Sequence, residues 1–381
     1  MFCEIQRHKK KKKKKKVMKM VGLSLEYRVL IFFALVISLV VVLAAESADN
    51  NGGSERDYIT WDDLTVDENG LASSKSNSDL QVILVDQNGN GHSSTVQGAV
   101  DMVPDHNTQR VKIYIFPGTY REKVFVPKNK PYVSFIGKRN ETHGAVITWN
   151  SKSSDIGSNG QELGTYGSAT VAVESDYFCA SRIAFENSVV AKAGGQGMQG
   201  VALRVESKRA MFFQVKFLGT QDTLLDDTGT HYFLKCFIQG KIDFICGSAR
   251  SLYEGCRLRS TADSYGAIAA HHRDTPNEDT GFSFVDCSIQ GTGQVYLGRA
   301  WGDYSRIIYS NCYMDDIIIP QGWTEWNHPS REKTALFGEF QCKGKGAETS
   351  DRVSWSKSLT YDEAKPFLDR SFINGDQWLR L

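Results

Sequence analysis

The sequence predicts an all-β fold, a single-stranded parallel β-helix in which each coil of the chain stacks on the coil before it. From residue 80 onward, short apolar runs rich in Val, Ile and aromatic residues each end on turn residues, which is the pattern of β-strands. After residue 170, similar units recur about every 20–30 residues, and strand-only repeats of that length are typical of a solenoid. A β-sandwich is the alternative, and six matching units disfavour it.

Each element of this fold has its own signal. The early strands are QVILVD, VKIYIFPG, PYVSFIG, AVITW and ATVAVES. Residues 93–103 predict one early helix, because apolar residues recur there at three- and four-residue spacing. A short helix is expected over 361–368 with Thr360 as N-cap, so that short helices lie at the ends. The repeats place these residues at equivalent positions: Lys216, Cys236, Cys256, Cys287, Cys312 and Cys342.

The N-terminus predicts export. Residues 29–45 are an apolar run preceded by basic residues, which is the layout of a secretory signal peptide. A signal anchor is the alternative, because the run is close to the minimum length that spans a bilayer. We interpret the lysine run 9–16 as an over-extended gene start. The expected organisation is a leader at 1–45, a polar and mostly flexible segment at 46–80, and one catalytic β-helix domain at 81–381.

Charge and cysteine content narrow the possible partners. The first 28 residues hold 11 of the 45 basic and 2 of the 44 acidic residues, so the rest of the chain carries a formal charge of about −8. Such a body disfavours nucleic acid as a partner, since binding phosphates requires basic surface. Export permits disulfides, and Cys236 and Cys256, one coil apart, satisfy the required Cα separation. We therefore predict a disulfide bond between Cys236 and Cys256. We also predict that Asn140, in the sequon NET, is glycosylated.

Four polar residues recur at the spacing of one coil. Gln199 lies 22 residues before Gln221, which precedes Asp222, and Asp243 follows 21 residues later. Stacked strands are about 4.8 Å apart, so these side chains should converge. Two adjacent carboxylates cannot ionise independently, which favours one ionised nucleophile and one protonated acid. The two amides are candidate donors to an oxyanion.

Further residues fit a binding cleft around this cluster. Arg299 is a fixed cation that could orient a carboxylate, and Trp301 shares its strand face. Singly, each residue has a structural explanation: buried aspartates cap turns, and an arginine more often forms a surface ion pair of little weight. Their common register favours a site. Aromatic residues available for stacking on sugar rings are Tyr166, Phe244, Trp301, Trp323 and Trp326. We found no ligand spacing for a metal and no cofactor motif, and expect neither.

Several motifs together resemble the plant pectinesterases. They are GTYRE, QGVALRV, GTQDTL, GKIDFICG, YLGRAW and GWTEW, in order over residues 80–381. The longer pattern, which includes WDDL, VQGAVDMVP and AAHHRDT, is similar to the quartet-type members of that family. The resemblance implies a right-handed parallel β-helix, like the pectin-lyase solenoid. It also implies hydrolysis of the methyl esters of homogalacturonan to methanol and free carboxylates.

The resemblance also implies roles, residue by residue. Asp243 would be the nucleophile, and Asp222 the acid that protonates methanol and then the base that activates water. Gln199 and Gln221 would stabilise the oxyanion, and Arg299 would hold Asp243. Cleft aromatics would be Tyr166, Phe244, Trp301 and Trp323. The implied partners are pectin and a pectinesterase inhibitor protein, and the expected state is a monomer secreted to the cell wall.

The chain departs from the family pattern at a few positions, none of them catalytic. Gly200, Lys241, Cys246 and Ala300 replace the usual residues, and His271–His272 replaces a Gln-Gly-Arg pattern; we expect these histidines in an exposed loop. Two other functions remain possible interpretations of the residues alone. Paired carboxylates about 5 Å apart also suit a retaining β-helical glycoside hydrolase, and a non-catalytic solenoid could bind wall polysaccharide.

Overall fold

The computed structural model describes residues 57–71, 81–139, 144–190 and 195–381. The predicted signal peptide, the lysine run and the Asn140 sequon lie outside these residues. All of the described residues fall in one compact unit, whose bounds are Arg56–Leu381. No helix in these ranges has the length and apolar character needed to cross a membrane.

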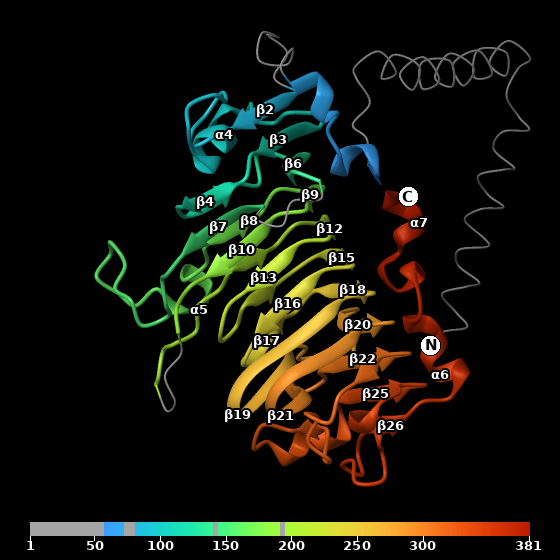
Figure 1. Ribbon diagram of the computed structural model, residues 1–381. Coiled ribbons are helices and arrows are strands. Elements are labelled where there is room, and N and C mark those ends of the chain that lie inside the picture. The colour runs from blue at the N-terminus through green and yellow to red at the C-terminus, as the bar shows by residue number, and fades with distance from the viewer. Residues whose placement is uncertain (1–56, 72–80, 140–143, 191–194) are drawn as a thin grey trace, which may run out of the picture. The chain divides into compact units, whose positions relative to one another are not determined.

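Two large sheets build the solenoid, and every pairing between named strands is parallel (Figure 1). The eleven-stranded sheet contains, in spatial order, β2 (Val82–Val85), β3 (Val111–Ile115), β6 (Val133–Gly137), β9 (Phe178–Ser181), β12 (Arg209–Phe213), β15 (Thr230–Leu234), β18 (Arg250–Glu254), β20 (Gly281–Val285), β22 (Arg306–Ser310), β25 (Leu336–Phe340) and β26 (Lys357–Ser358). Neighbours in this order are successive coils of the chain, which confirms the predicted parallel β-helix.

The fourteen-stranded sheet covers the two other faces of each coil. One face holds β4 (Gly118–Arg121), β7 (Ala145–Trp149), β10 (Ala184–Asn187), β13 (Lys216–Leu218) and β16 (Phe237–Gly240). The other holds β5 (Val124–Val126), β8 (Val171–Val173), β11 (Leu203–Val205), β14 (Leu224–Asp226) and β17 (Ile242–Gly247). The long strands β19 (Arg257–His271) and β21 (Ser288–Ala300) run through both faces and join them, with β23 (Tyr313–Met314) and β24 (Trp323–Thr324) beside β21.

The repeat in the sequence marks one corner of the coil. At this corner a residue with left-handed φ, such as Lys235 at 53° or Gly255 at 60°, turns the chain before a residue that points inward. The inward residues form a ladder of thiols on successive coils: Cys236, Cys256, Cys287, Cys312 and Cys342. Lys216 was wrongly aligned with them, because it pairs with Phe237 in the sheet; Val215 therefore holds the position equivalent to Cys236.

The predicted disulfide between Cys236 and Cys256 is wrong in this structure, where both are free thiols. In a parallel ladder, equivalent side chains point in the same direction. Each sulfur is directed at a carbonyl of the preceding coil: Cys236 Sγ donates to the carbonyl of Phe212 at 3.4 Å, and Cys256 Sγ to that of Phe233 at 3.3 Å. The coils are thus stacked closely enough for a bond, but the thiols are hydrogen-bonded instead.

An aromatic stack fills the interior behind the eleven-stranded sheet. Successive ring centroids lie 4.5–4.7 Å apart with nearly parallel planes, in the order Phe212, Phe233, Tyr253, Phe284 and Tyr309. Each ring comes from one coil, so a spacing close to that of the strands follows from the register. All five residues are fully buried, and offset stacking of such rings adds stability beyond their burial.

A buried polar network interrupts this core beneath β14. Asp226 accepts a hydrogen bond from Tyr253 Oη at 2.6 Å and lies 2.5 Å from His231 Nδ1. The other ring nitrogen, Nε2, lies 2.8 Å from the carbonyl of Ser207. A carbonyl can only accept, so Nε2 carries a hydrogen. One further proton is consequently shared between His231 and Asp226, whose side chains are fully buried.

Helices lie at the ends of the solenoid and in its loops. The α-helices are α4 (Val96–Met102), α5 (Gly164–Gly167), α6 (Tyr361–Ala364) and α7 (Gly375–Trp378). The 3-10 helices are η2 (Asp62–Leu64), η3 (Glu68–Gly70), η4 (Pro329–Lys333), η5 (Lys345–Ala347), η6 (Lys365–Phe367) and η7 (Arg370–Ile373). The predicted helix at 93–103 is α4. The one predicted at 361–368 is α6 followed by η6, with Thr360 forming a capping box; Pro366 in η6 cannot continue the α-helical hydrogen bonding.

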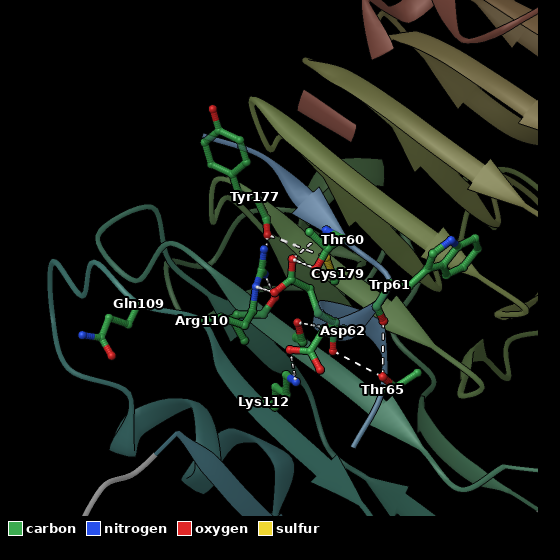
Figure 2. A network of polar contacts seen from close by, with 12 residues as sticks. Thr60, Trp61, Asp62, Thr65, Gln109, Arg110, Lys112, Tyr177 and Cys179 are labelled. Atoms are coloured by element: carbon green, nitrogen blue, oxygen red, sulfur yellow. Dashed lines mark hydrogen bonds and ion pairs between the residues drawn. The ribbon is translucent and has the colours of Figure 1, made fainter. Parts of the chain in front are cut away.

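The first described segment packs on the solenoid together with the C-terminus. β1 (Ile59–Thr60) pairs with β27 (Leu379–Arg380). Asp63 forms a buried ion pair with Arg110 at 3.4 Å, and Arg110 also donates to the carbonyl of Tyr177 at 2.6 Å. Figure 2 shows this network, with Lys112 reaching Asp62 beside it at 2.9 Å. Residues 57–71 therefore belong to the packed domain, which begins before the predicted boundary at residue 81.

Candidate active site

A row of side chains, one from each coil, runs along the outer face of the fourteen-stranded sheet. The strand register aligns Arg204, Leu225, Cys246, Ala270, Arg299 and Thr324. Four steps of about 4.8 Å place Arg204 and Arg299 about 19 Å apart. Between the two cations the row is apolar, and its three members pack in one small cluster. The apolar members of the row and Arg299 form the floor of a pocket.

The chain places Asp222 and Asp243 beside this floor through two irregular backbone positions. Both residues have left-handed φ, 57° for Asp222 and 46° for Asp243, a conformation that few non-glycine residues adopt. The pairing of β17 with β19 shifts register between Ile242 and Ile245, and such bulges often redirect a side chain at a functional site. The two coils are directly bonded, since the amide of Asp222 donates to the carbonyl of Ile242 at 3.1 Å.

The pocket brings all five predicted catalytic residues together. Its volume is about 370 Å³, and its lining is Thr165, Tyr166, Gln199, Gln221, Asp222, Leu225, Asp227, Asp243, Cys246, Ala270, Arg299, Trp301 and Trp326. The coil spacing in the sequence had predicted the convergence of four of them, and Arg299 had been added from the YLGRAW stretch. Asp227 was not predicted, although it follows Leu225 by two residues and so shares the outward face of that coil.

Arg299 holds one oxygen of Asp243 and leaves the other unpaired. Nη2 of Arg299 donates to Oδ2 of Asp243, whereas Oδ1 is buried without a hydrogen-bond partner among the described residues. The guanidinium carbon also lies 3.2 Å from the ring centroid of Trp326. Burial lowers the pKa of Arg299 to about 10, so the group remains a cation at neutral pH. This geometry suits a carboxylate that attacks through Oδ1.

Asp222 differs from Asp243 because desolvation has the largest effect on its carboxyl group. Burial raises its pKa to about 7, although Arg299 and a hydrogen bond from Thr165 at 3.4 Å act against the shift. A large share of Asp222 is therefore protonated at neutral pH and can donate a proton. Two carboxyl groups in one pocket with different protonation states are the requirement for paired nucleophilic and acid-base chemistry.

The two glutamines lie on adjoining coils at the same pocket. The amide of Gly200 donates to the carbonyl of Gln221 at 3.0 Å, which ties the loop of Gln199 to the coil of Asp222. Oε1 of Gln199 is buried and has no partner within the described residues. Gly200, one of the departures from the family pattern, fits tightly here, since a Cβ there would lie 2.8 Å from Oδ1 of Asn187.

The aromatic predictions are partly wrong. Tyr166 and Trp301 line the pocket, and Tyr166 is 50% exposed with the Arg204 guanidinium 3.5 Å from its ring centroid. Phe244, in contrast, is fully buried in the main core, because the bulge at Asp243 turns it inward against Gly240. Trp323 is also buried, stacked on Phe337 at 4.7 Å. Trp326, three residues further along, lines the pocket instead.

The other unusual residues have structural explanations. His271 is fully buried, not in an exposed loop, and burial lowers its pKa to about 3, so it is neutral; its Nδ1 accepts from the amide of Arg306 at 3.2 Å. His272 is half-buried, with its ring centroid 4.9 Å from that of Trp301. Lys241 pairs with Asp263 at 2.7 Å. Cys246 belongs to the pocket floor.

Comparison with known proteins agrees with the motifs. The family model described as pectinesterase matches residues 82–376. Pectinesterase QRT1 of Arabidopsis thaliana is 56% identical over 371 residues, which cover 92% of this chain and 97% of that protein. Probable pectinesterase 8 of the same plant is 41% identical over 307 residues, 78% of this chain and 76% of that protein. The solved pectin methylesterase from carrot is 33% identical with a TM-score of 0.71, covering 78% of this chain and 94% of that chain.

Proposed function

This chain belongs to the pectinesterase family, whose members remove methyl esters from pectin, and on that premise we propose how its residues carry out the hydrolysis. The fold is the right-handed parallel β-helix of the pectin methylesterases. Family membership also selects between the two reactions that paired carboxylates permit, ester hydrolysis and glycoside hydrolysis. The observation that carries the proposal is the buried Oδ1 of Asp243, which no described residue hydrogen-bonds, in a pocket that Asp222 shares.

In the first step Asp243 attacks the ester. Its Oδ1 forms a bond to the carbonyl carbon of the methyl galacturonate, and the carbonyl electrons move to the oxygen. The amide groups of Gln199 and Gln221 are the candidate donors to this oxyanion. As the carbonyl re-forms, the bond to the methoxy group breaks and protonated Asp222 gives its proton to the departing oxygen. The products are methanol and an acid anhydride between Asp243 and the galacturonic acid.

In the second step water hydrolyses this anhydride. Asp222, now a carboxylate, takes a proton from water while the water oxygen bonds to the galacturonyl carbon. The bond to Asp243 Oδ1 then breaks, which restores the Asp243 carboxylate and re-forms protonated Asp222. Arg299 keeps Asp243 oriented through both steps and favours the ionised form that attacks first and is released last. The galacturonic acid leaves and ionises in water.

The pocket lining supports binding of a sugar polymer. Tyr166 and Trp301 both line the pocket and are partly exposed. Trp326 lines the same pocket beneath the Arg299 guanidinium. Because sugar rings present apolar faces to such side chains, we assign these three aromatics to binding of the galacturonan backbone.

Cellular context is part of the proposal. The plant relatives indicate an enzyme of the cell wall. We propose that residues 29–45 direct secretion, that Asn140 is glycosylated, and that the enzyme acts as a monomer subject to a pectinesterase inhibitor protein. These four points rest on the sequence and the resemblance.

The test of the reaction is the identity of the product. Purified protein is incubated with highly methylated pectin, and methanol and new reducing ends are measured in the same samples. We expect methanol to accumulate in step with titratable acid while the number of reducing ends stays constant. New reducing ends without methanol would show that the protein is a glycoside hydrolase and not an esterase.

A further inference from the structure

The pocket contains a third carboxyl group that the proposed reaction does not use. Asp227 lines it together with Asp222 and Asp243. Its side chain is half-buried and forms no hydrogen bond or ion pair with the described residues, whereas Asp243 is paired with Arg299. A charge facing the substrate without a partner acts on whatever charge the substrate brings.

The coils next to Asp227 add to its negative charge. The backbone amide of Asp227 donates to the carbonyl of Val205, and that of Glu206 to the carbonyl of Val173. The register of β14, β11 and β8 therefore continues past the strand ends and stacks Asp227, Glu206 and Glu174 on successive coils. Each step along this row is about 4.8 Å.

The nearest cation does not neutralise Asp227 by direct pairing. Arg204 is 5% exposed, donates to Glu206, and pairs with Glu174 at 3.2 Å. Its flat face covers the ring of Tyr166. The carboxyl groups of Asp227, Glu206 and Glu174 therefore have one guanidinium among them, that of Arg204. The other charged groups near Asp227 are Asp226 and His231, which share a proton in the core.

We propose, on the basis of the function proposed above, that Asp227 is a specificity-determining residue that selects methylated neighbours of the reacting sugar. A methyl galacturonate is neutral, whereas a free galacturonate carries a carboxylate. The carboxylate would be repelled by Asp227 at close range in a partly desolvated pocket, while the neutral ester is accepted on the apolar floor formed by Leu225, Cys246 and Ala270.

This selection has a consequence for the pattern of products. Each hydrolysis converts a neutral sugar into an anion, so a chain that moves by one residue brings a new carboxylate towards Asp227. Contiguous attack is then disfavoured, and the enzyme releases the chain. The free acids should be dispersed along the polymer and not gathered in blocks.

The experiment compares two substrates and two variants. The substrates are fully methylated oligogalacturonides and the same oligomers with about half of their esters removed at random by alkali. For each protein the ratio of kcat/KM per ester on the two substrates is measured from methanol release. Asp227→Asn removes the charge with almost no change of shape. Asp376→Asn is the matched control, because Asp376 is exposed in α7, outside the fourteen-stranded sheet and the pocket.

We expect wild-type protein to prefer the fully methylated oligomers and Asp227→Asn to reduce that preference roughly five- to tenfold at low ionic strength. Asp376→Asn should keep the wild-type ratio. Raising the salt concentration to about 0.5 M should weaken the wild-type preference, since screening shortens the range of the repulsion. It should change the ratio of Asp227→Asn less, because only Glu206 and Glu174 of this carboxyl row then remain. Fragment analysis of the products should show longer runs of free acid with the variant.

The result that overturns the inference is a preference that is the same in wild-type protein and Asp227→Asn. The salt series on wild-type protein is a second measurement that needs no variant, and a preference insensitive to salt also contradicts it. Failure of the proposed function is distinguishable, because wild-type protein would then release no methanol from either substrate.

Discussion

Asp222 and Asp243 are the same residue type on adjoining coils, and the side chains around them make them chemically different. Arg299 pairs with Asp243, whereas Asp222 is desolvated and receives only the 3.4 Å contact from Thr165. The pKa of Asp222 rises to about 7 as a result. This difference assigns the roles of nucleophile and acid, which residue spacing alone cannot do.

The first prediction concerns the pH dependence at Asp222. The protonated form is needed as the acid, so the rate of the first step should fall as pH rises through about 7. Asp222→Asn should retain the fold and lose roughly 100-fold or more in kcat. The measurement is a pH profile of methanol release. If the residual activity of Asp222→Asn falls at alkaline pH in the same way as the wild-type activity, the fall is caused by the titration of another group.

The same raised pKa has an effect on stability. Folded Asp222 keeps its proton to higher pH than the unfolded chain does, so its contribution to stability is complete below about pH 4 and is lost as pH rises through about 7. As pH rises from about 4 to about 7, the stability of Asp222→Asn relative to wild-type protein should therefore increase by roughly 1–3 kcal/mol. A difference between the two proteins that does not change with pH would contradict the raised pKa.

At the scale of single elements, the buried network of Asp226, His231 and Tyr253 joins three strands from two neighbouring coils. Asp226 ends β14, His231 lies in β15 and Tyr253 in β18. Burial and the neighbouring carboxyl group raise the pKa of Tyr253 well above its ordinary value, so its hydroxyl remains a donor. The network fixes the end of the strand that follows Asp222 and precedes Asp227.

The second prediction concerns this network. Asp226→Ala removes both acceptor oxygens and leaves the buried Tyr253 hydroxyl and His231 without their partner, and it should cost about 2–4 kcal/mol in the free energy of unfolding. Asp376→Ala, at an exposed residue of α7, should stay within about 0.5 kcal/mol of wild type. The free energies are measured by denaturant titration, and equal midpoints for the two variants would show that the network contributes nothing.

The elements also show what the sequence could and could not predict. Strand-like runs and the coil spacing were enough to place Gln199, Asp222 and Asp243 in one pocket. The direction of Phe244 was not predictable, because it depends on the register shift next to Asp243, and alternation cannot be counted across a bulge. The prediction that Trp323 lies in the cleft was wrong for a related reason, because in a two-residue strand the residue pattern does not indicate which face is inward.

For the whole molecule, the stacking of successive coils forms the solenoid, and short segments cover part of the outer surface of the solenoid. A second hydrophobic cluster lies outside the eleven-stranded sheet and includes Ile59 and Leu64 from the N-terminal segment and Trp378 from the C-terminus. The sequence did not predict the N-terminal cover, because residues 57–71 are largely polar and show no periodicity. Their docking depends on particular contacts, such as Asp63 with Arg110.

The third prediction tests the N-terminal cover. Leu64 is fully buried, so Leu64→Ala should lower the free energy of unfolding by about 2–4 kcal/mol. The control Val190→Ala, at a side chain that is 72% exposed, should change it by less than about 0.5 kcal/mol. Methanol release per folded molecule should be unchanged in Leu64→Ala, because the pocket lies on the other sheet; unaltered stability would mean that the segment does not dock in solution.

The central claim is that Asp243 is the group that attacks the ester, and the rate of methanol release by Asp243→Asn tests it most directly. The substitution keeps the size of the side chain, removes the nucleophilic carboxylate, and leaves Arg299 and Asp222 in place. We predict a loss of at least about 1,000-fold in kcat for a variant whose circular dichroism and Tm are close to those of wild type. A folded Asp243→Asn protein that releases methanol within a few-fold of the wild-type rate would contradict the mechanism.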